Sequence, residues 1–131
     1  MTIFKNEKNI DNDETEVYVI HPALGTPAGY YHFLAEEISK TKGNHVVVFE
    51  IRGNGTSSEI ASSSKDWGYY TLIENDFEIH VPFVLEIFKK NPIVLVGHSL
   101  GGQVGSLYVS KLVLEKSEIK RLYIFNVWIL I

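Results

Sequence analysis

The segment GHSLGG, residues 97–102, carries the strongest chemical signal in this 131-residue chain. It follows the apolar run Ile93–Val96 and precedes a helical pattern that opens at Leu100. A serine in this setting is typical of a nucleophile elbow, a tight strand-to-helix turn that exposes the serine hydroxyl. We therefore expect Ser99 to have a sparsely populated backbone conformation and the Leu100 amide to stabilise an oxyanion. The alternative is a glycine-rich turn that holds an inert serine.

The loop HPALGTPAG, residues 21–29, is the second segment that could take part in chemistry. It follows the apolar run Val17–Ile20 and precedes another helical pattern. A loop in this place can supply a second backbone amide to an oxyanion hole, and we predict Ala23 as that donor, with Leu24 as the alternative. Its two prolines and two glycines would equally make a rigid turn without chemistry. We expect His21 to be a structural loop residue and not a catalytic base.

The segment RGNGTS, residues 52–57, has two glycines one residue apart after another apolar run. Such glycines can cradle a phosphate, but a dinucleotide site needs a third glycine and a following helix, and this segment has neither. We therefore predict that no dinucleotide binds here. The segment is expected to form a turn in which Arg52 pairs with a nearby carboxylate.

Four apolar runs are expected to form buried parallel strands, because their apolar residues are nearly continuous. They are residues 17–20, 46–51, 93–97 and 121–131. Apolar residues recur at helical spacing over residues 30–40, 67–90 and 100–116. Gly43 should end the first of these helices, and Pro82 should kink the second or begin a new one. This order predicts an α/β fold with a mostly parallel sheet and helices on both faces.

The composition is that of one globular domain, with 45% apolar, 12% aromatic and 21% charged residues. The net charge of −4 argues against a nucleic-acid partner. The chain has no cysteine, which excludes disulfides, thiolate metal sites and a cysteine nucleophile. We predict no cofactor and no metal.

The polar segment of residues 1–15 lacks the continuous apolar stretch of a secretory signal. The longest apolar run, Leu122–Ile131, has about half the roughly 20 residues that a membrane-spanning helix needs. We therefore expect a cytoplasmic protein without a membrane span, in which residues 16–131 form one partial domain. Because residues 121–131 end the chain as an apolar strand, we also expect self-association through them.

The segments HPALGTPAG, RGNGTSS, DWGYY and VGHSLGGQ occur in an order and at intervals that resemble the amino-terminal half of the α/β-hydrolase superfamily. The chain is most similar to predicted hydrolases grouped with serine aminopeptidase-like and lysophospholipase-like enzymes. The resemblance covers residues 16–131, and GHSLGG is its most specific motif. It implies Ser99 as the nucleophile and the amides of Ala23 and Leu100 as the oxyanion hole. It also implies an antiparallel strand at the start of the sheet, for which residues 1–15 offer little room.

The resemblance further implies an acid and a histidine that follow the nucleophile along the chain. After Ser99 the only acids are Glu115 and Glu118, which we expect to be solvated, and there is no histidine. Among the upstream histidines, His98 should point away from Ser99, and only His21 lies at the correct edge of the sheet to substitute as a base. We therefore expect the acid and the histidine to lie beyond the end of this sequence, and this chain to have little or no activity.

These residues favour a serine hydrolase of ester, thioester or amide bonds that acts by acyl transfer on a small-molecule substrate. A second hypothesis is a binding module that holds a small acyl ligand over Ser99 without turnover. A third is a non-functional truncation product. The sequence does not distinguish the second from the third, and it does not identify the substrate.

Overall fold

The computed structural model describes residues 1–113 and 119–125, which build one mixed five-stranded sheet in the order β1-β3-β2-β4-β5. The strands are β1 (Thr2–Phe4), β2 (Val17–His21), β3 (His45–Val48), β4 (Ile93–His98) and β5 (Ile119–Phe125). The pairs β2 with β3, β2 with β4, and β4 with β5 are parallel. The predicted α/β fold with a mostly parallel sheet is therefore confirmed.

The first strand corrects the expectation that residues 1–15 have too little room for an antiparallel strand. Strand β1 pairs antiparallel with β3, and Thr2 lies opposite Val48. Three residues are enough, because only one edge of β1 needs a backbone partner at the border of a sheet. Another correction concerns the run 46–51, which is a strand only as far as Val48. Beyond it Phe49 and Ile51 stay buried in irregular backbone.

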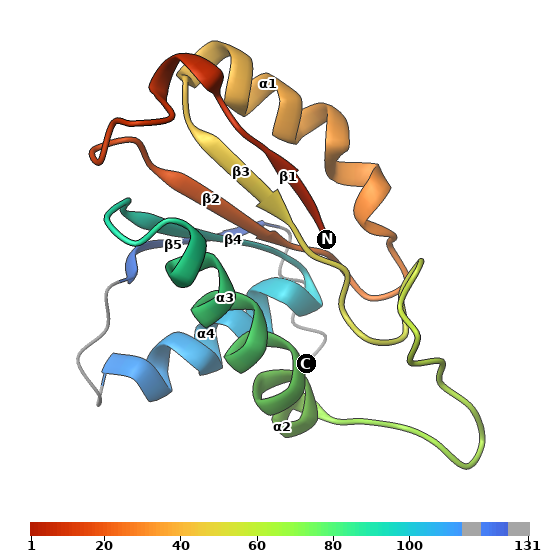
Figure 1. Cartoon of the computed structure of the whole chain (residues 1–131). Helices are drawn as coiled ribbons and strands as arrows, with labels where there is room; N and C mark the ends of the chain where they lie inside the picture. Colours follow the sequence, from red (N-terminus) through yellow and green to blue (C-terminus); the bar gives the residue numbers. More distant parts are fainter. Residues whose placement is uncertain (114–118, 126–131) are drawn as a thin grey trace.

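Helices cover both faces of the sheet (Figure 1). Helix α1 (His32–Lys42) covers one face, while α3 (Glu78–Ile87) and α4 (Leu100–Val113) cover the other. Helix α1 follows a short 3-10 turn over Ala28–Tyr31 and ends as predicted at Gly43, whose φ is 70°. Within the described residues, no helix is long and apolar enough to cross a membrane.

The helical stretch predicted over residues 67–90 is divided, but not at Pro82. It consists of α2 (Tyr69–Leu72), a π-helical turn over Ile73–Phe77, and α3, which contains Pro82 in its interior. The π turn contains more residues than an α-helical turn, so it changes which side chains of the helical stretch point toward the sheet before α3 begins. As a result, Leu72, Phe77 and Val84 are all buried against the same side of the sheet.

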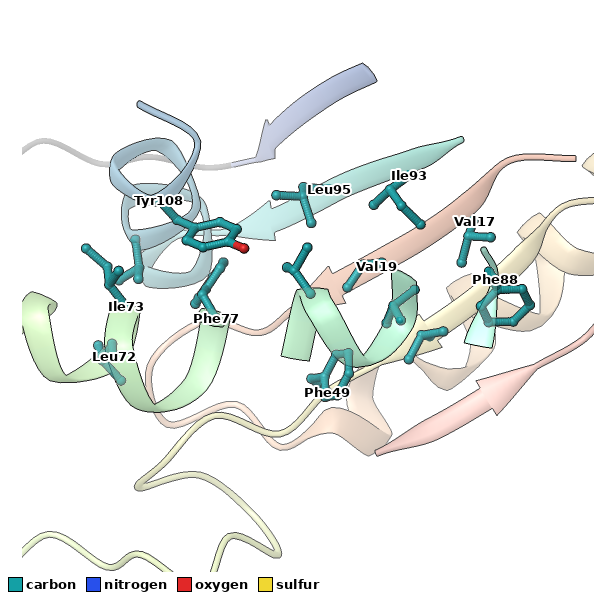
Figure 2. Close-up of a cluster of buried hydrophobic side chains, with 14 residues drawn as sticks. Val17, Val19, Phe49, Leu72, Ile73, Phe77, Phe88, Ile93, Leu95 and Tyr108 are labelled. Carbon is teal, nitrogen blue, oxygen red and sulfur yellow. The ribbon is translucent and has the colours of Figure 1, made fainter. Parts of the chain in front are cut away.

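Alternation along the strands divides the core into two clusters, because successive side chains of a strand point to opposite faces. Val17 and Val19 of β2 and Leu95 of β4 belong to the cluster beneath α3 and α4. In Figure 2, Leu95 lies near Tyr108, and Val17 lies near Phe88 at the other end of the cluster. The second cluster lies beneath α1. It contains Ile20, Ala28, Tyr31, Ala35, Val46, Val48, Val94 and Val96. This packing fixes the carboxyl ends of β2, β3 and β4 at one edge of the sheet, where the candidate site lies.

Strand β5 is the last strand of the sheet order, and among the described residues only β4 pairs with it. An apolar edge strand offers unpaired backbone groups to another chain. We predict that this chain self-associates as its concentration rises, and that removal of residues 121–131, of which 126–131 lie outside the described residues, improves its solubility. Sedimentation velocity over a concentration series checks this. A monomer that stays monodisperse and unfolds cooperatively at the highest concentration would contradict it.

Candidate active site

Ser99 lies at the junction between β4, which ends at His98, and α4, which begins at Leu100. Its φ is +51°, and it is the only residue other than glycine with a positive φ among the described residues. The Ser99 carbonyl already accepts the Gln103 amide at 3.0 Å, so the helix starts directly at the turn. A left-handed serine is strained, and the predicted elbow geometry is therefore present.

Two glycines beside Ser99 let three backbone segments approach closely. A Cβ atom at Gly97 would lie 2.4 Å from the Cα atom of Gly102 in α4. A Cβ atom at Gly101 would lie 2.4 Å from the carbonyl oxygen of His21 and 2.7 Å from that of Pro22. The amino end of α4 is consequently pressed against both β4 and the loop that follows β2. This contact places the HPALG loop next to the serine elbow.

The Ala23 amide, predicted as an oxyanion donor, is engaged in this structure. It donates a hydrogen bond to the hydroxyl of Tyr31 at 3.0 Å. The same hydroxyl is 2.7 Å from Nδ1 of His98, the residue before the nucleophile. Burial raises the pKa of Tyr31, so its hydroxyl stays protonated at neutral pH. An acceptor in the site must therefore displace the Tyr31 hydroxyl to bind the Ala23 N–H.

The backbone N–H groups that follow Ala23 in this loop have different hydrogen-bond partners. Gly25 donates to Oδ1 of Asn54 at 2.8 Å, and Thr26 donates to the Ala23 carbonyl at 3.1 Å. Within the described part of the chain, the Leu24 amide has no hydrogen-bond partner, and neither has the Leu100 amide at the start of α4. Free N–H groups at a loop and at a helix start are the groups that bind a developing oxyanion.

His21 is buried and paired with a second histidine. Its ring is 1% exposed and stacks on Phe77 with ring centroids 3.8 Å apart. Nε2 of His21 is 3.3 Å from Nδ1 of His80, which stacks in turn on Phe49 at 3.9 Å. Burial, with a contribution from His80, lowers the pKa of His21 far below its usual value. Burial also lowers the pKa of His80 to about 4, so both rings are neutral at pH 7.

The other three histidines contact groups other than Ser99, and Nε2 of His32 is buried with no hydrogen-bond partner among the described residues. His45 lies at the opposite end of the sheet, where its Nδ1 accepts the Asn6 amide at 3.1 Å. His32 packs edge-on against Phe4, and His98 bonds Tyr31. All five histidines of the sequence are therefore accounted for, and none of their described hydrogen bonds reaches Ser99.

The turn after β3 contains the ion pair expected from the sequence. Nε of Arg52 lies 3.1 Å from Oδ1 of Asp76, and the Arg52 backbone amide donates to the other carboxylate oxygen. This pair joins the turn to the π-helical segment before α3. Among the described residues, no group of three or more histidine, aspartate or glutamate side chains could hold a metal ion.

A family model described as the alpha/beta hydrolase fold matches residues 17–129 of this sequence. This chain belongs to the alpha/beta-hydrolase family. The match includes both the loop after β2 and the serine elbow. The search of curated proteins found no match to this chain.

Solved structures agree with the family assignment. Est1E from Butyrivibrio proteoclasticus, solved with ferulic acid, has a TM-score of 0.70 and 18% identity, covering 92% of this chain and 45% of its own. A thermostable carboxyl esterase from Bacillus coagulans has a TM-score of 0.73 and 17% identity, and the match covers 93% of this chain and 37% of the esterase chain. A monoacylglycerol lipase from Paleococcus ferrophilus has a TM-score of 0.66 and 20% identity, and the match covers 94% of this chain and 40% of the lipase chain. At these identities the likeness shows the fold alone. This chain spans 37–45% of the length of these structures.

The sequence analysis does not single out two polar residues of this candidate site, Tyr31 and Asn54. The sequence places Tyr31 only within a helical pattern, whereas its hydroxyl contacts both the loop and the elbow in the structure. The sequence predicts a plain turn around Asn54, whereas the structure buries this residue to 2% exposure and bonds it to the HPALG loop. The signal for Asn54 was its place between two glycines, which is typical of a turn with a fixed side-chain direction.

The close contact at Gly101 predicts a large effect of one methyl group. Gly101→Ala should lower the free energy of unfolding by about 2 kcal/mol or more, because the new Cβ meets backbone atoms that cannot move independently. Urea unfolding followed by circular dichroism measures this loss. Gly29→Ala is the matched control, because its Cβ would meet nothing within 4 Å, and its effect should stay near about 0.5 kcal/mol. Equal effects of the two substitutions would contradict the close packing.

The neutral histidine pair predicts that acid weakens the fold. The pKa of His80 is about 4 in the folded chain against 6.5 in the unfolded chain, so below pH 6.5 the unfolded chain binds more protons. The free energy of unfolding should therefore fall as the pH is lowered from 6.5 toward 4. Between pH 7 and pH 5, His80→Phe should reduce this loss by about 2 kcal/mol. Urea unfolding at the two pH values measures it, and equal losses in variant and wild type would refute the assignment.

Proposed function

We propose that this chain carries the nucleophile and the oxyanion hole of a serine hydrolase that cleaves ester, thioester or amide bonds. The observation that carries the proposal is the positive φ of Ser99 at the β4–α4 junction. Strain of this kind persists where the surrounding structure enforces it, and here it presents a serine at the carboxyl edge of a parallel sheet. Family membership and neighbours with esterase and lipase names support hydrolysis in general.

In the proposed reaction, Oγ of Ser99 attacks the carbonyl carbon of the substrate while its proton passes to a base. The carbonyl π electrons move to oxygen, and this oxyanion accepts hydrogen bonds from the Leu100 amide and from one amide of the HPALG loop. Collapse of the intermediate expels the alcohol, thiol or amine, which takes up the proton. Water then cleaves the acyl-enzyme by the same steps.

The loop offers two candidates for the second donor. The Leu24 N–H has no hydrogen-bond partner among the described residues, so an oxyanion that binds it displaces no bond within this part of the chain. The Ala23 N–H, which the sequence resemblance favours, becomes available when the oxyanion replaces the Tyr31 hydroxyl. Ala23 stays the proposed donor on resemblance, and Leu24 is the donor that the hydrogen bonds of the free site support.

The proposal does not assign the triad base to any histidine of this chain. All five histidines of this chain are engaged in other contacts, and the acids Glu115 and Glu118 lie outside the described residues. A neutral serine without a base is a weak nucleophile. The site in this chain is accordingly proposed to bind and polarise a carbonyl without turning it over. A cytoplasmic location is proposed on the sequence alone.

A thiol in place of the serine hydroxyl tests the oxyanion hole without needing a base. The chain has no cysteine, so Ser99→Cys introduces a single thiol, part of which is thiolate at pH 8.5. Attack on p-nitrophenyl acetate forms a thioester through an oxyanion, whereas displacement of iodide from iodoacetamide forms none. We predict that the ratio of acylation rate to alkylation rate exceeds that of N-acetylcysteine amide by at least roughly tenfold.

Two controls accompany this measurement. The wild-type chain should be labelled negligibly by a fluorophosphonate, because no base activates Ser99. Rapid labelling that Ser99→Ala abolishes would show that an upstream group, His21 first, acts as the base. A ratio no greater than that of the free thiol would overturn the proposed oxyanion hole and favour a ligand-binding module without catalytic machinery.

A further inference from the structure

Asn54 lies on a tight turn after β3, and its side chain is almost completely buried. The glycines on either side, Gly53 and Gly55, have φ values of 82° and 45°, which few other residues adopt. The backbone N–H of Asn54 donates to the backbone carbonyl of Ile51 at 3.1 Å, and the backbone carbonyl of Asn54 accepts the backbone N–H of Ser57 at 2.9 Å. The turn therefore holds the Asn54 side chain in one direction.

All three hydrogen bonds of this side chain go to the loop after β2. Oδ1 of Asn54 accepts the Gly25 amide at 2.8 Å. Nδ2 donates to the carbonyls of Ala23 at 2.8 Å and Thr26 at 3.0 Å. One amide side chain thus binds one donor and two acceptors of a four-residue loop that comes from a distant part of the sequence. Among side chains of this length, only the carboxamide of asparagine offers the one acceptor oxygen and the two N–H donors that these three hydrogen bonds need.

These bonds determine where the loop amides point. The Ala23 carbonyl and the Leu24 N–H belong to one planar trans peptide and point in opposite directions. Because Asn54 holds that carbonyl, the Leu24 N–H is directed away from Asn54. The bond to Gly25 fixes the next peptide in the same way. On the other side of the loop, the Tyr31 hydroxyl holds the Ala23 N–H.

We propose that Asn54 is a positioning residue for the oxyanion hole, acting through the backbone of residues 23–26. The inference rests on the proposed function, because it assigns a purpose to the direction of these amides. Asn54 does not touch the substrate. Its effect is confined to the alignment of the loop donors, and a displacement of donors by about 1 Å is enough to cost orders of magnitude in rate.

A purely structural staple would behave differently, and the chain contains one for comparison. Nδ2 of Asn91 donates to the carbonyls of Asn12 at 3.0 Å and Thr15 at 2.9 Å. It too holds a loop through two carbonyl groups, but it precedes β4 and lies at the amino end of the strand, opposite Ser99. Asn91→Ala therefore removes comparable hydrogen bonds without affecting the oxyanion loop.

The test compares these two asparagines in the Ser99→Cys background. In Asn54→Ala and in Asn54→Asp, which keeps the size and one acceptor but loses both donors, the rate of acylation by p-nitrophenyl acetate should fall roughly tenfold or more. The rate of alkylation by iodoacetamide should change by less than about twofold, because that reaction forms no oxyanion. Asn91→Ala should leave the ratio of the two rates unchanged.

The outcomes separate the two proposals. If Ser99→Cys alone shows no excess acylation over the free thiol, the oxyanion hole itself is refuted. If it shows the excess and both Asn54 variants retain it, only the role of Asn54 is refuted. If either Asn54 variant lowers alkylation as much as acylation, or Asn91→Ala lowers the ratio equally, the residue is a structural staple and the positioning role is overturned. Circular dichroism at the assay temperature selects the folded variants for comparison.

Discussion

The missing side chains of Gly97 and Gly101 are the constraint on which the rest of the site depends. They let the first turn of α4 lie in contact with β4 behind it and with the His21 and Pro22 carbonyls beside it. Ser99 stands where these segments meet, so its left-handed backbone is enforced from both sides. The strain stays in place because helix, strand and loop would all have to move to release it.

A layer of polar side chains then joins the loops at the carboxyl edge of the sheet. Asn54 binds the loop after β2, and Glu50 accepts the Ala28 amide at 3.0 Å and the Thr56 amide at 3.3 Å. Arg52 connects the same turn to Asp76. Because buried or half-buried polar groups are costly when unpaired, each of these bonds restricts its loop to one arrangement.

The histidines show that residue type does not decide a role. His21 ends β2, which pairs with the strand that precedes Ser99, yet its ring stacks on Phe77 and lies against His80. Desolvation keeps this pair neutral, which suits it to packing within an aromatic stack. Proton transfer at Ser99 would need a ring that faces the serine. In the described structure, His21 and His80 instead pack with Phe49 and Phe77.

Some features were determined by the sequence alone. Continuous apolar runs specified buried parallel strands, helical spacing specified the layers on both faces, and GHSLGG after such a run specified the elbow, because these signals are local and follow from backbone geometry. The short strand β1 escaped detection because three residues carry no periodicity. The helical stretch 67–90 is interrupted at the π turn and not at Pro82. The reason is tertiary, because the buried side chains on both sides of the π turn pack against the same face of the sheet. The partners of Ala23, His21 and Asn54 were also beyond the sequence. Each is a contact between segments distant along the chain, and only the packing of the strands brings those segments together.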